Sequence, residues 1–159
     1  MIKVGDYVPD ARLFRMSSKG SESISPLDWF SGINAVVFAV PGAFTPLCSA
    51  QHLPGYLTKS AEFIAKGIDK IVCISVNDVY VMDAWGRDQG VTDEIEMFAD
   101  GSALFTKAAG LVLDLSDAGF GIRSLRYAMM VRNRVITHLN IEKSGKFEVS
   151  NAESMLELL

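Results

Sequence analysis

The segment INAVVFAVPGAFTPLC, residues 33 to 48, joins an apolar run to a loop that ends at a cysteine. The run at 33–40 is rich in β-branched side chains, which is typical of a strand buried on both faces of a parallel sheet. We therefore expect a central strand here. The loop at 41–48 would leave the carboxyl end of that strand, where α/β proteins usually bind their ligands.

Alternating strands and helices are predicted after this segment. A helix should follow the loop and stop at Gly67, because apolar residues recur there at three- and four-residue steps: Leu53, Tyr56, Leu57, Ala61, Ile64 and Ala65. The segment KIVCISV at 70–76 predicts a second buried strand, and IEMFAD at 95–100 a short third one. Between them, residues 78–90 predict a helix closed by glycine.

The last third of the chain departs from this alternation. A helix at 102–110 leads into a long glycine-containing loop at 114–126, which its length marks as functional. Residues 127–141 predict an antiparallel hairpin that turns at 132–134. Ser150 and Glu153 form a capping box, so a final helix should start near residue 151. The pattern predicts an α/β, thioredoxin-like fold in which helices flank a central mixed sheet.

Length and composition limit the classes of function. With 159 residues and 49% apolar content, the chain predicts one domain spanning 1–159. A net charge of −4 argues against nucleic acid as a partner, and no segment approaches the ~20 apolar residues that span a membrane. Two cysteines are too few for a disulfide framework, which favours a reducing, cytoplasmic location. An organellar form without its transit peptide is the alternative.

Cys48 stands where the predicted strand–loop–helix junction favours a reactive thiol. A helix N-terminus stabilises the thiolate through its dipole and its free N–H donors. An ordinary thiol is only about 3% ionised at pH 7, so full ionisation adds roughly 30-fold to the supply of nucleophile. Enzymes typically reach about 10⁶-fold or more. Other groups must therefore stabilise the transition state.

The residues before Cys48 are candidates for that role. Thr45 lies three positions earlier, so its hydroxyl can donate to the sulfur or to a bound oxygen. Pro41 and Pro46 stiffen the loop and remove two N–H donors, while Gly42 allows a ligand to approach the backbone. The alternative is an ordinary turn before a buried structural cysteine.

The spacing of Pro41, Thr45 and Cys48 resembles the active-site motif of the peroxiredoxins. Four further segments narrow the resemblance to the type-II subfamily, which includes atypical two-cysteine and plant-type members. They are PGAFTPLCSAQHLPGY, ISVND, FADGS and GIRSLRYAMMV. The resemblance runs from VGDYVPDARL to the end of the chain. It implies a thiol-dependent peroxidase that reduces hydrogen peroxide and organic hydroperoxides without a metal or other cofactor.

The resemblance also implies roles for single residues. Cys48 matches the peroxidatic cysteine, Thr45 the hydroxyl that orients peroxide and sulfur, and Pro41 the residue that shields the thiolate. Arg126 matches the active-site arginine, whose fixed charge would stabilise the leaving oxygen. Arg123 is a weaker alternative that more simply supports the loop.

Three other residues have competing interpretations. His52 lies four residues after Cys48 and belongs to the peroxide-site surround, acts as a general base, or binds a metal with Cys48; the resemblance favours the first. Phe44 and Phe120 line the substrate pocket or simply pack in the core.

Cys73 lies in the middle of a predicted strand, where a small buried thiol is expected. Plant-type relatives carry a cysteine here that has been considered as a resolving partner, but the strand interior is poorly placed for a disulfide with Cys48. The atypical two-cysteine members carry theirs near the C-terminus, where this chain has none. We therefore expect an external thiol, either glutathione with glutaredoxin or thioredoxin.

The resemblance further implies a homodimer that pairs around Phe44, Pro46 and residues 79–85. A function of another class also fits a thioredoxin-like chain, namely a redox sensor or holdase whose cysteine does not turn over. Such a module would not need the full set of Pro41, Thr45, Cys48 and Arg126.

Overall fold

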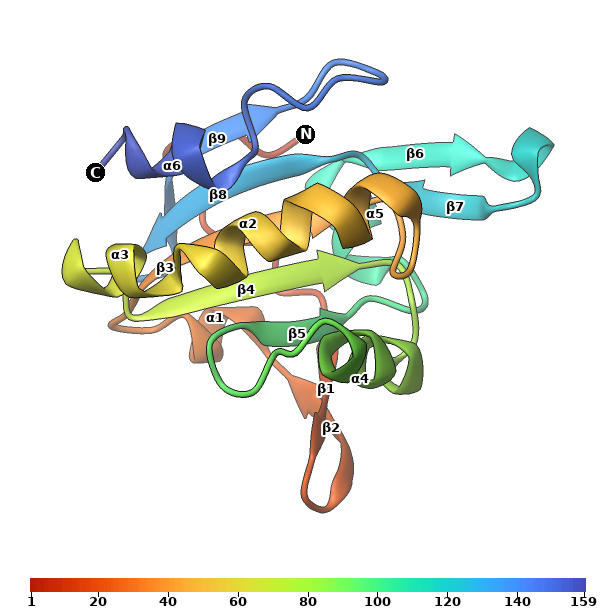
Figure 1. Cartoon of the computed structure of the whole chain (residues 1–159), viewed down its shortest axis with the longest axis horizontal. Coiled ribbons are helices and arrows are strands. Elements are labelled where there is room, and N and C mark those ends of the chain that lie inside the picture. Colours follow the sequence, from red (N-terminus) through yellow and green to blue (C-terminus); the bar gives the residue numbers. More distant parts are fainter.

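The apolar segment at 33–40 forms a strand in the interior of a seven-stranded sheet, as predicted. The computed structural model describes residues 1–159. In it, β3 (Asn34–Val40) pairs in parallel with β4 (Lys70–Ser75) and antiparallel with β8 (Tyr127–Arg132) (Figure 1). The full order is β2-β1-β5-β4-β3-β8-β9. Its other members are β1 (Leu13–Ser17), β2 (Gly20–Ile24), β5 (Glu96–Ala99) and β9 (Val135–Ile141).

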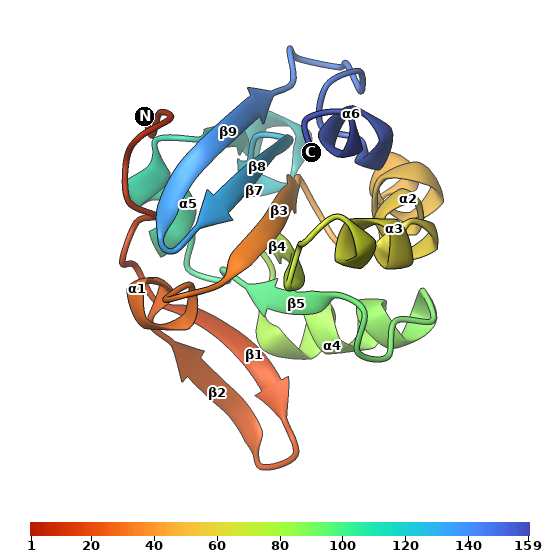
Figure 2. The ribbon, with the colours of Figure 1, turned by 90° about the vertical axis from the view of Figure 1, so that its left-hand side faces the viewer.

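Helices cover both faces of this mixed sheet. α2 (Leu53–Thr58), α3 (Ser60–Ala65), α4 (Val79–Asp88) and α6 (Ala152–Leu156) lie on one side (Figure 2). The shorter α1 (Pro26–Trp29) and α5 (Leu104–Ala109) lie on the other. None of these helices has the length and apolar content that crossing a membrane requires.

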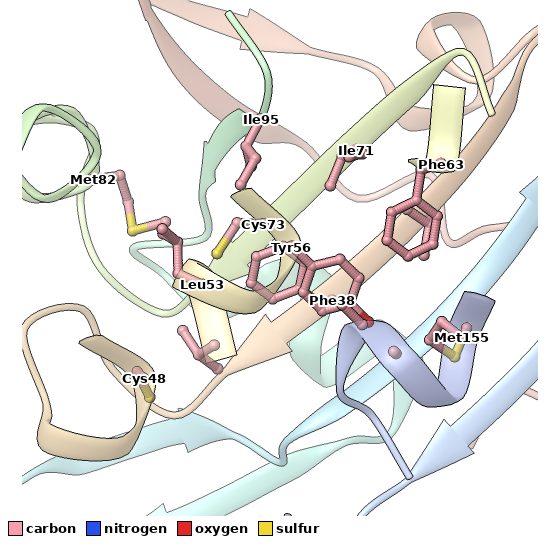
Figure 3. Packing of buried hydrophobic residues seen from close by; sticks show 14 of the residues in the cluster. Phe38, Cys48, Leu53, Tyr56, Phe63, Ile71, Cys73, Met82, Ile95 and Met155 are labelled. Atoms are coloured by element: carbon pink, nitrogen blue, oxygen red, sulfur yellow. The ribbon is translucent and has the colours of Figure 1, made fainter. Parts of the chain in front are cut away.

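Alternation along β3 divides the core into two clusters. Val36, Phe38 and Val40 pack toward α2, α3 and α4, whereas the intervening residues of β3 face the α1 and α5 side. Both cysteines belong to the first cluster (Figure 3). Cys73 points into it from the middle of β4, and Cys48 enters it from the loop beyond β3.

The predicted helix after Cys48 is divided into three parts. It begins as a π-helix, Cys48–His52, and continues as α2 and α3, which are separated at Lys59. A π-turn is a wide turn with i→i+5 hydrogen bonds that is often found at functional sites. The predicted apolar face is correct only in its first half: Leu53 and Tyr56 are buried, whereas Ala61, Ile64 and Ala65 are exposed and Phe63 enters the core from α3. Regular three- and four-residue spacing carried across the break at Lys59 does not reveal this rotation or where the turn widens.

Two other predictions were wrong in detail. The loop predicted at 114–126 is largely a small antiparallel ladder, β6 (Val112–Leu115) with β7 (Gly121–Ser124). The final helix is capped by Asn151, whose side chain accepts from Ser154 N, and not by Ser150. The Ser150 hydroxyl instead donates to the carboxylate of Glu142.

Candidate active site

Cys48 is fully buried at the first residue of the π-helix. The loop that carries it starts where β3 ends. Asn77, two residues after the end of β4, holds this loop, because its side chain accepts from the Ala43 backbone N–H at 3.0 Å. Ser75 Oγ donates to the same amide oxygen at 2.6 Å. The thiol is therefore held at the carboxyl edge of two parallel strands, as the sequence predicted.

Arg126, directly before β8, contacts the same thiol. Its Nη2 donates to Cys48 Sγ at 3.2 Å, although 78 positions separate the two residues. A guanidinium carries a fixed positive charge, which can stabilise a thiolate at this position. The ring of Phe147 lies 5.6 Å from Arg126 Cζ and covers the guanidinium.

His52 holds the other end of the same guanidinium. Arg126 Nη1 lies 2.7 Å from His52 Nδ1, and His52 Nε2 lies 3.0 Å from the carbonyl oxygen of Ser150. Because a carbonyl can only accept, Nε2 carries the proton and Nδ1 accepts from Arg126. Burial, and then the charge of Arg126, lower the pKa of His52 from 6.5 to about 3. The ring is thus neutral at physiological pH.

This geometry favours one of the three interpretations of His52. Both ring nitrogens are occupied by protein partners, so neither is directed at a substrate proton or a metal. No group of three or more His, Cys, Asp or Glu side chains is placed to hold a metal ion. His52 lies beside the Cys48 site and positions Arg126. This agrees with the interpretation of His52 as part of the peroxide-site surround.

A buried carboxylate that sequence reasoning missed anchors this arrangement. Glu142 accepts hydrogen bonds from the backbone N–H groups of Glu148, Val149 and Ser150 and from the Ser150 hydroxyl. Burial alone would raise the pKa of Glu142, but these donors outweigh it and the pKa is lowered. Ser150 thereby presents its carbonyl to His52, and Tyr56 donates to the same oxygen at 2.7 Å. No spacing pattern in the sequence marks Glu142.

The threonine and glycine of the motif have other partners than those predicted. Thr45 Oγ1 donates to the carbonyl oxygen of Gly42 at 2.6 Å, so in this structure its proton is directed to the loop backbone and not to Cys48. A Cβ on Gly42 would meet Thr45 Cγ2 at 3.0 Å and Arg123 Nη1 at 3.2 Å. The glycine thus makes room for these two side chains. Pro41 is half-buried beside them.

Arg123 supports the loop, which is the simpler of the two roles considered for it. Its Nε donates to the Phe120 carbonyl and its Nη1 to the Val76 carbonyl, which ties β7 to the end of β4.

The core interpretation of the two phenylalanines was wrong. Phe44 and Phe120 are each about half exposed, at 52% and 51%. Phe44 also has a positive φ of 64°, which is uncommon for a residue other than glycine.

Cys73 shares the cluster of Cys48 but none of its polar contacts. It is fully buried, and both cysteines are free. Burial raises the pKa of the Cys73 thiol well above its ordinary value. A neutral thiol of this kind is a poor nucleophile. The sequence interpretation of Cys73 as a core residue therefore agrees with its surroundings.

Together these contacts suit one kind of chemistry. A sulfur anion beside a fixed cation can attack an electrophilic oxygen, and the same cation can stabilise the negative charge that develops on the leaving oxygen. The neutral His52 keeps the guanidinium directed at the sulfur without adding a competing charge. The site is thus organised for nucleophilic attack by Cys48.

Comparisons with known proteins agree with this reading. The Redoxin family model matches residues 3–156. Peroxiredoxin-2D of Arabidopsis thaliana is 44% identical over 159 residues, which cover 99% of this chain and 98% of that protein. The chloroplastic Peroxiredoxin-2E of the same plant is also 44% identical, over 99% of this chain and 69% of its own length.

A solved structure gives the same result for the fold. The structure described as reduced Prx3 of Vibrio vulnificus in complex with hydrogen peroxide superposes with a TM-score of 0.96. It is 48% identical, and the match covers 99% of each chain. The predicted thioredoxin-like peroxiredoxin fold is confirmed. The chain belongs to the peroxiredoxins of the Redoxin family and is a thiol-dependent peroxidase.

Proposed function

We propose that Cys48 is the peroxidatic cysteine, that Arg126 stabilises both its thiolate and the leaving oxygen, and that Pro41 and Thr45 complete the site. The observation that carries this proposal is the 3.2 Å hydrogen bond from Arg126 Nη2 to Cys48 Sγ. In the reaction, the sulfur forms a bond to the terminal oxygen of the peroxide as the O–O bond breaks. The leaving oxygen takes up a proton, and Cys48 becomes a sulfenic acid.

The proposed substrates are hydrogen peroxide and alkyl hydroperoxides. The likeness to a structure described as a complex with hydrogen peroxide supports the first of these.

We propose that the fold acts as one domain over residues 1–159.

An external thiol is proposed as the reductant, either glutathione with glutaredoxin or thioredoxin. Two facts support this choice. The segment 142–159 contains no cysteine, and Cys73 is enclosed in the core cluster. A sulfenic acid on Cys48 must therefore meet a thiol from another molecule before a second peroxide oxidises it further.

We also propose a homodimer that pairs around Phe44, Pro46 and residues 79–85 of α4. Phe44 is 52% exposed, Pro46 is exposed, and the ring of Phe44 lies 6.5 Å from that of Trp85 on α4. An exposed aromatic side chain at such a position favours a protein interface. Light scattering at high micromolar concentration should give the dimer mass, and a monomer there would contradict the proposal.

A reducing compartment such as the cytoplasm is proposed for the protein. Support comes from the two free cysteines, because thiols persist where glutathione and thioredoxin keep them reduced. One similar plant protein is chloroplastic, so an organelle that maintains reduced thiols is consistent with the same chemistry.

The test of the proposed function is peroxide consumption by purified protein in the presence of a thiol reductant. Cys48→Ser should abolish turnover, because a hydroxyl is not ionised at neutral pH and is a far weaker nucleophile. Cys73→Ser is the matched control, since it makes the same atomic change at the other buried cysteine. Undiminished turnover in Cys48→Ser would disprove the assignment.

A further inference from the structure

A cleft of about 180 Å³ opens beside the site. We name it the lysine cleft. It is lined by Pro41, Leu47, Leu113, Leu125, Arg126 and the segment 142–146. Pro41 and Arg126 belong to the proposed active site, and Leu47 directly precedes Cys48. The cleft therefore reaches the groups around the reacting sulfur.

Its volume exceeds what hydrogen peroxide needs. In the liquid a water molecule takes about 30 Å³, so the cleft has room for about six of them, whereas hydrogen peroxide has two heavy atoms. Leu47, Leu113 and Leu125 are each only partly buried and form an apolar wall. A hydrocarbon chain would bury this wall and so remove apolar surface from water.

The rim of the cleft is cationic. Lys143 and Lys146 are exposed, and neither forms an ion pair within the chain. Lys146 N donates to the Lys143 carbonyl at 2.9 Å, which closes a turn and holds the two residues together. Glu142 is the one acid in the lining, and its carboxylate is occupied by the backbone donors of residues 148–150. The two lysines are thus free to bind an anion.

From this combination we propose that the lysine cleft selects hydroperoxides that carry a carboxylate on an apolar chain, such as a fatty-acid hydroperoxide. The carboxylate binds Lys143 and Lys146, part of the chain lies on the three leucines, and the hydroperoxide group approaches Cys48 past Arg126. The sulfur takes the terminal oxygen, the O–O bond breaks, and the protonated leaving group is the corresponding hydroxy acid. This inference rests on the proposed peroxidase role of Cys48.

The experiment compares three substrates in single-turnover oxidation, without any reductant, by stopped-flow fluorescence. They are hydrogen peroxide, the hydroperoxide of linoleic acid and the hydroperoxide of its methyl ester, the two lipids below their critical micelle concentrations. Acid and ester differ only in the carboxylate. The double variant Lys143→Gln/Lys146→Gln should oxidise about three- to tenfold more slowly with the acid, because each exposed ion pair contributes modestly. Its rates with the ester and with hydrogen peroxide should stay unchanged.

The matched control is Lys19→Gln/Lys107→Gln, which removes the same net charge from exposed positions in the β1–β2 turn and on α5. It should leave all three rates unchanged. In the wild-type protein, added salt should slow the acid and not the ester, since screening weakens exposed pairs. Leu113→Ala should slow both lipids and spare hydrogen peroxide.

The outcomes separate this inference from the proposed function. Equal rates for acid and ester that do not respond to the lysine substitutions would overturn the inference, while leaving Cys48 as the peroxidatic residue. An effect of these substitutions confined to reduction of the sulfenic acid by glutathione would also overturn it, because the cleft would then serve the reductant. Failure of every peroxide to oxidise Cys48 would instead disprove the proposed function.

Discussion

Cys48 and Cys73 are both fully buried in one apolar cluster, yet they differ in every polar contact. Cys48 stands at a strand–helix junction and accepts a hydrogen bond from Arg126. Cys73 stands inside β4 among apolar side chains, where burial raises its pKa. Burial alone therefore does not decide the reactivity of a thiol in this fold. We propose that the position at the sheet edge and the cation placed there decide it.

The largest effect is expected when the cation beside Cys48 is removed. Arg126→Ala should slow oxidation of Cys48 by hydrogen peroxide about 100-fold, because it deletes a charged donor at the oxygen where negative charge develops. Arg123→Ala is the matched control and should act much less, since Arg123 donates to the carbonyls of Phe120 and Val76 and not to the sulfur. Stopped-flow oxidation rates measure both. The reverse order would show that Arg123 is the catalytic arginine.

A second prediction tests whether His52 is neutral in the folded protein. The folded-state pKa of His52 is about 3, against 6.5 when unperturbed. Below pH 6.5 the unfolded chain binds a proton that the folded protein does not. The contribution of His52 to stability is thus intact above pH 6.5 and is lost as the pH falls from 6.5 toward 3, by up to about 1.4 kcal/mol per pH unit.

Urea unfolding of the wild type and His52→Gln between about pH 7.5 and about pH 5 isolates this effect. The wild type should lose stability over this range, whereas the glutamine variant, which cannot titrate, should lose less. Glu142 does not interfere, because its contribution is lost between its unfolded pKa of 4.5 and its lower folded pKa, and it is the same in both proteins. Equal pH dependence in the two proteins would contradict a neutral, buried His52.

The smallest expected effect concerns the other cysteine. Cys73→Ala should leave turnover within about twofold of wild type and reduce the free energy of unfolding by about 1 kcal/mol, as a small core truncation does. Cys73→Ser should cost more stability, because a buried hydroxyl without a partner is introduced. Coupled peroxide assays and urea unfolding measure both. Loss of turnover in a folded Cys73→Ala protein would assign Cys73 a role in resolving the sulfenic acid.

The central strands could be predicted because their own residues are enough to indicate a buried strand. The apolar runs at 33–40 and 70–76 can satisfy their backbone and bury both faces only inside a sheet. The position of Cys48 followed from the same argument. The widening of the first helix into a π-turn and the ladder of β6 with β7 could not be predicted, since both depend on packing between segments distant in sequence.

The contacts within the site were predicted less completely than its members. Resemblance supplied Arg126, whereas spacing could not have paired it with a cysteine 78 positions away. Thr45 was expected to donate to the sulfur or to a bound oxygen, and in this structure it donates to the Gly42 carbonyl. Glu142 was missed because a buried carboxylate that accepts backbone N–H groups leaves no periodic pattern, and its role depends on the fold of the loop it anchors.

The most direct test of the account is mass spectrometry of the wild-type protein after one equivalent of hydrogen peroxide, with free thiols blocked and no external thiol present. We predict a sulfenic acid on Cys48 that dimedone traps, and a glutathione adduct on the same residue when glutathione is added. A dominant intramolecular species two hydrogens lighter than the reduced chain would contradict the account, because it would show that Cys73 leaves the core to form a disulfide with Cys48.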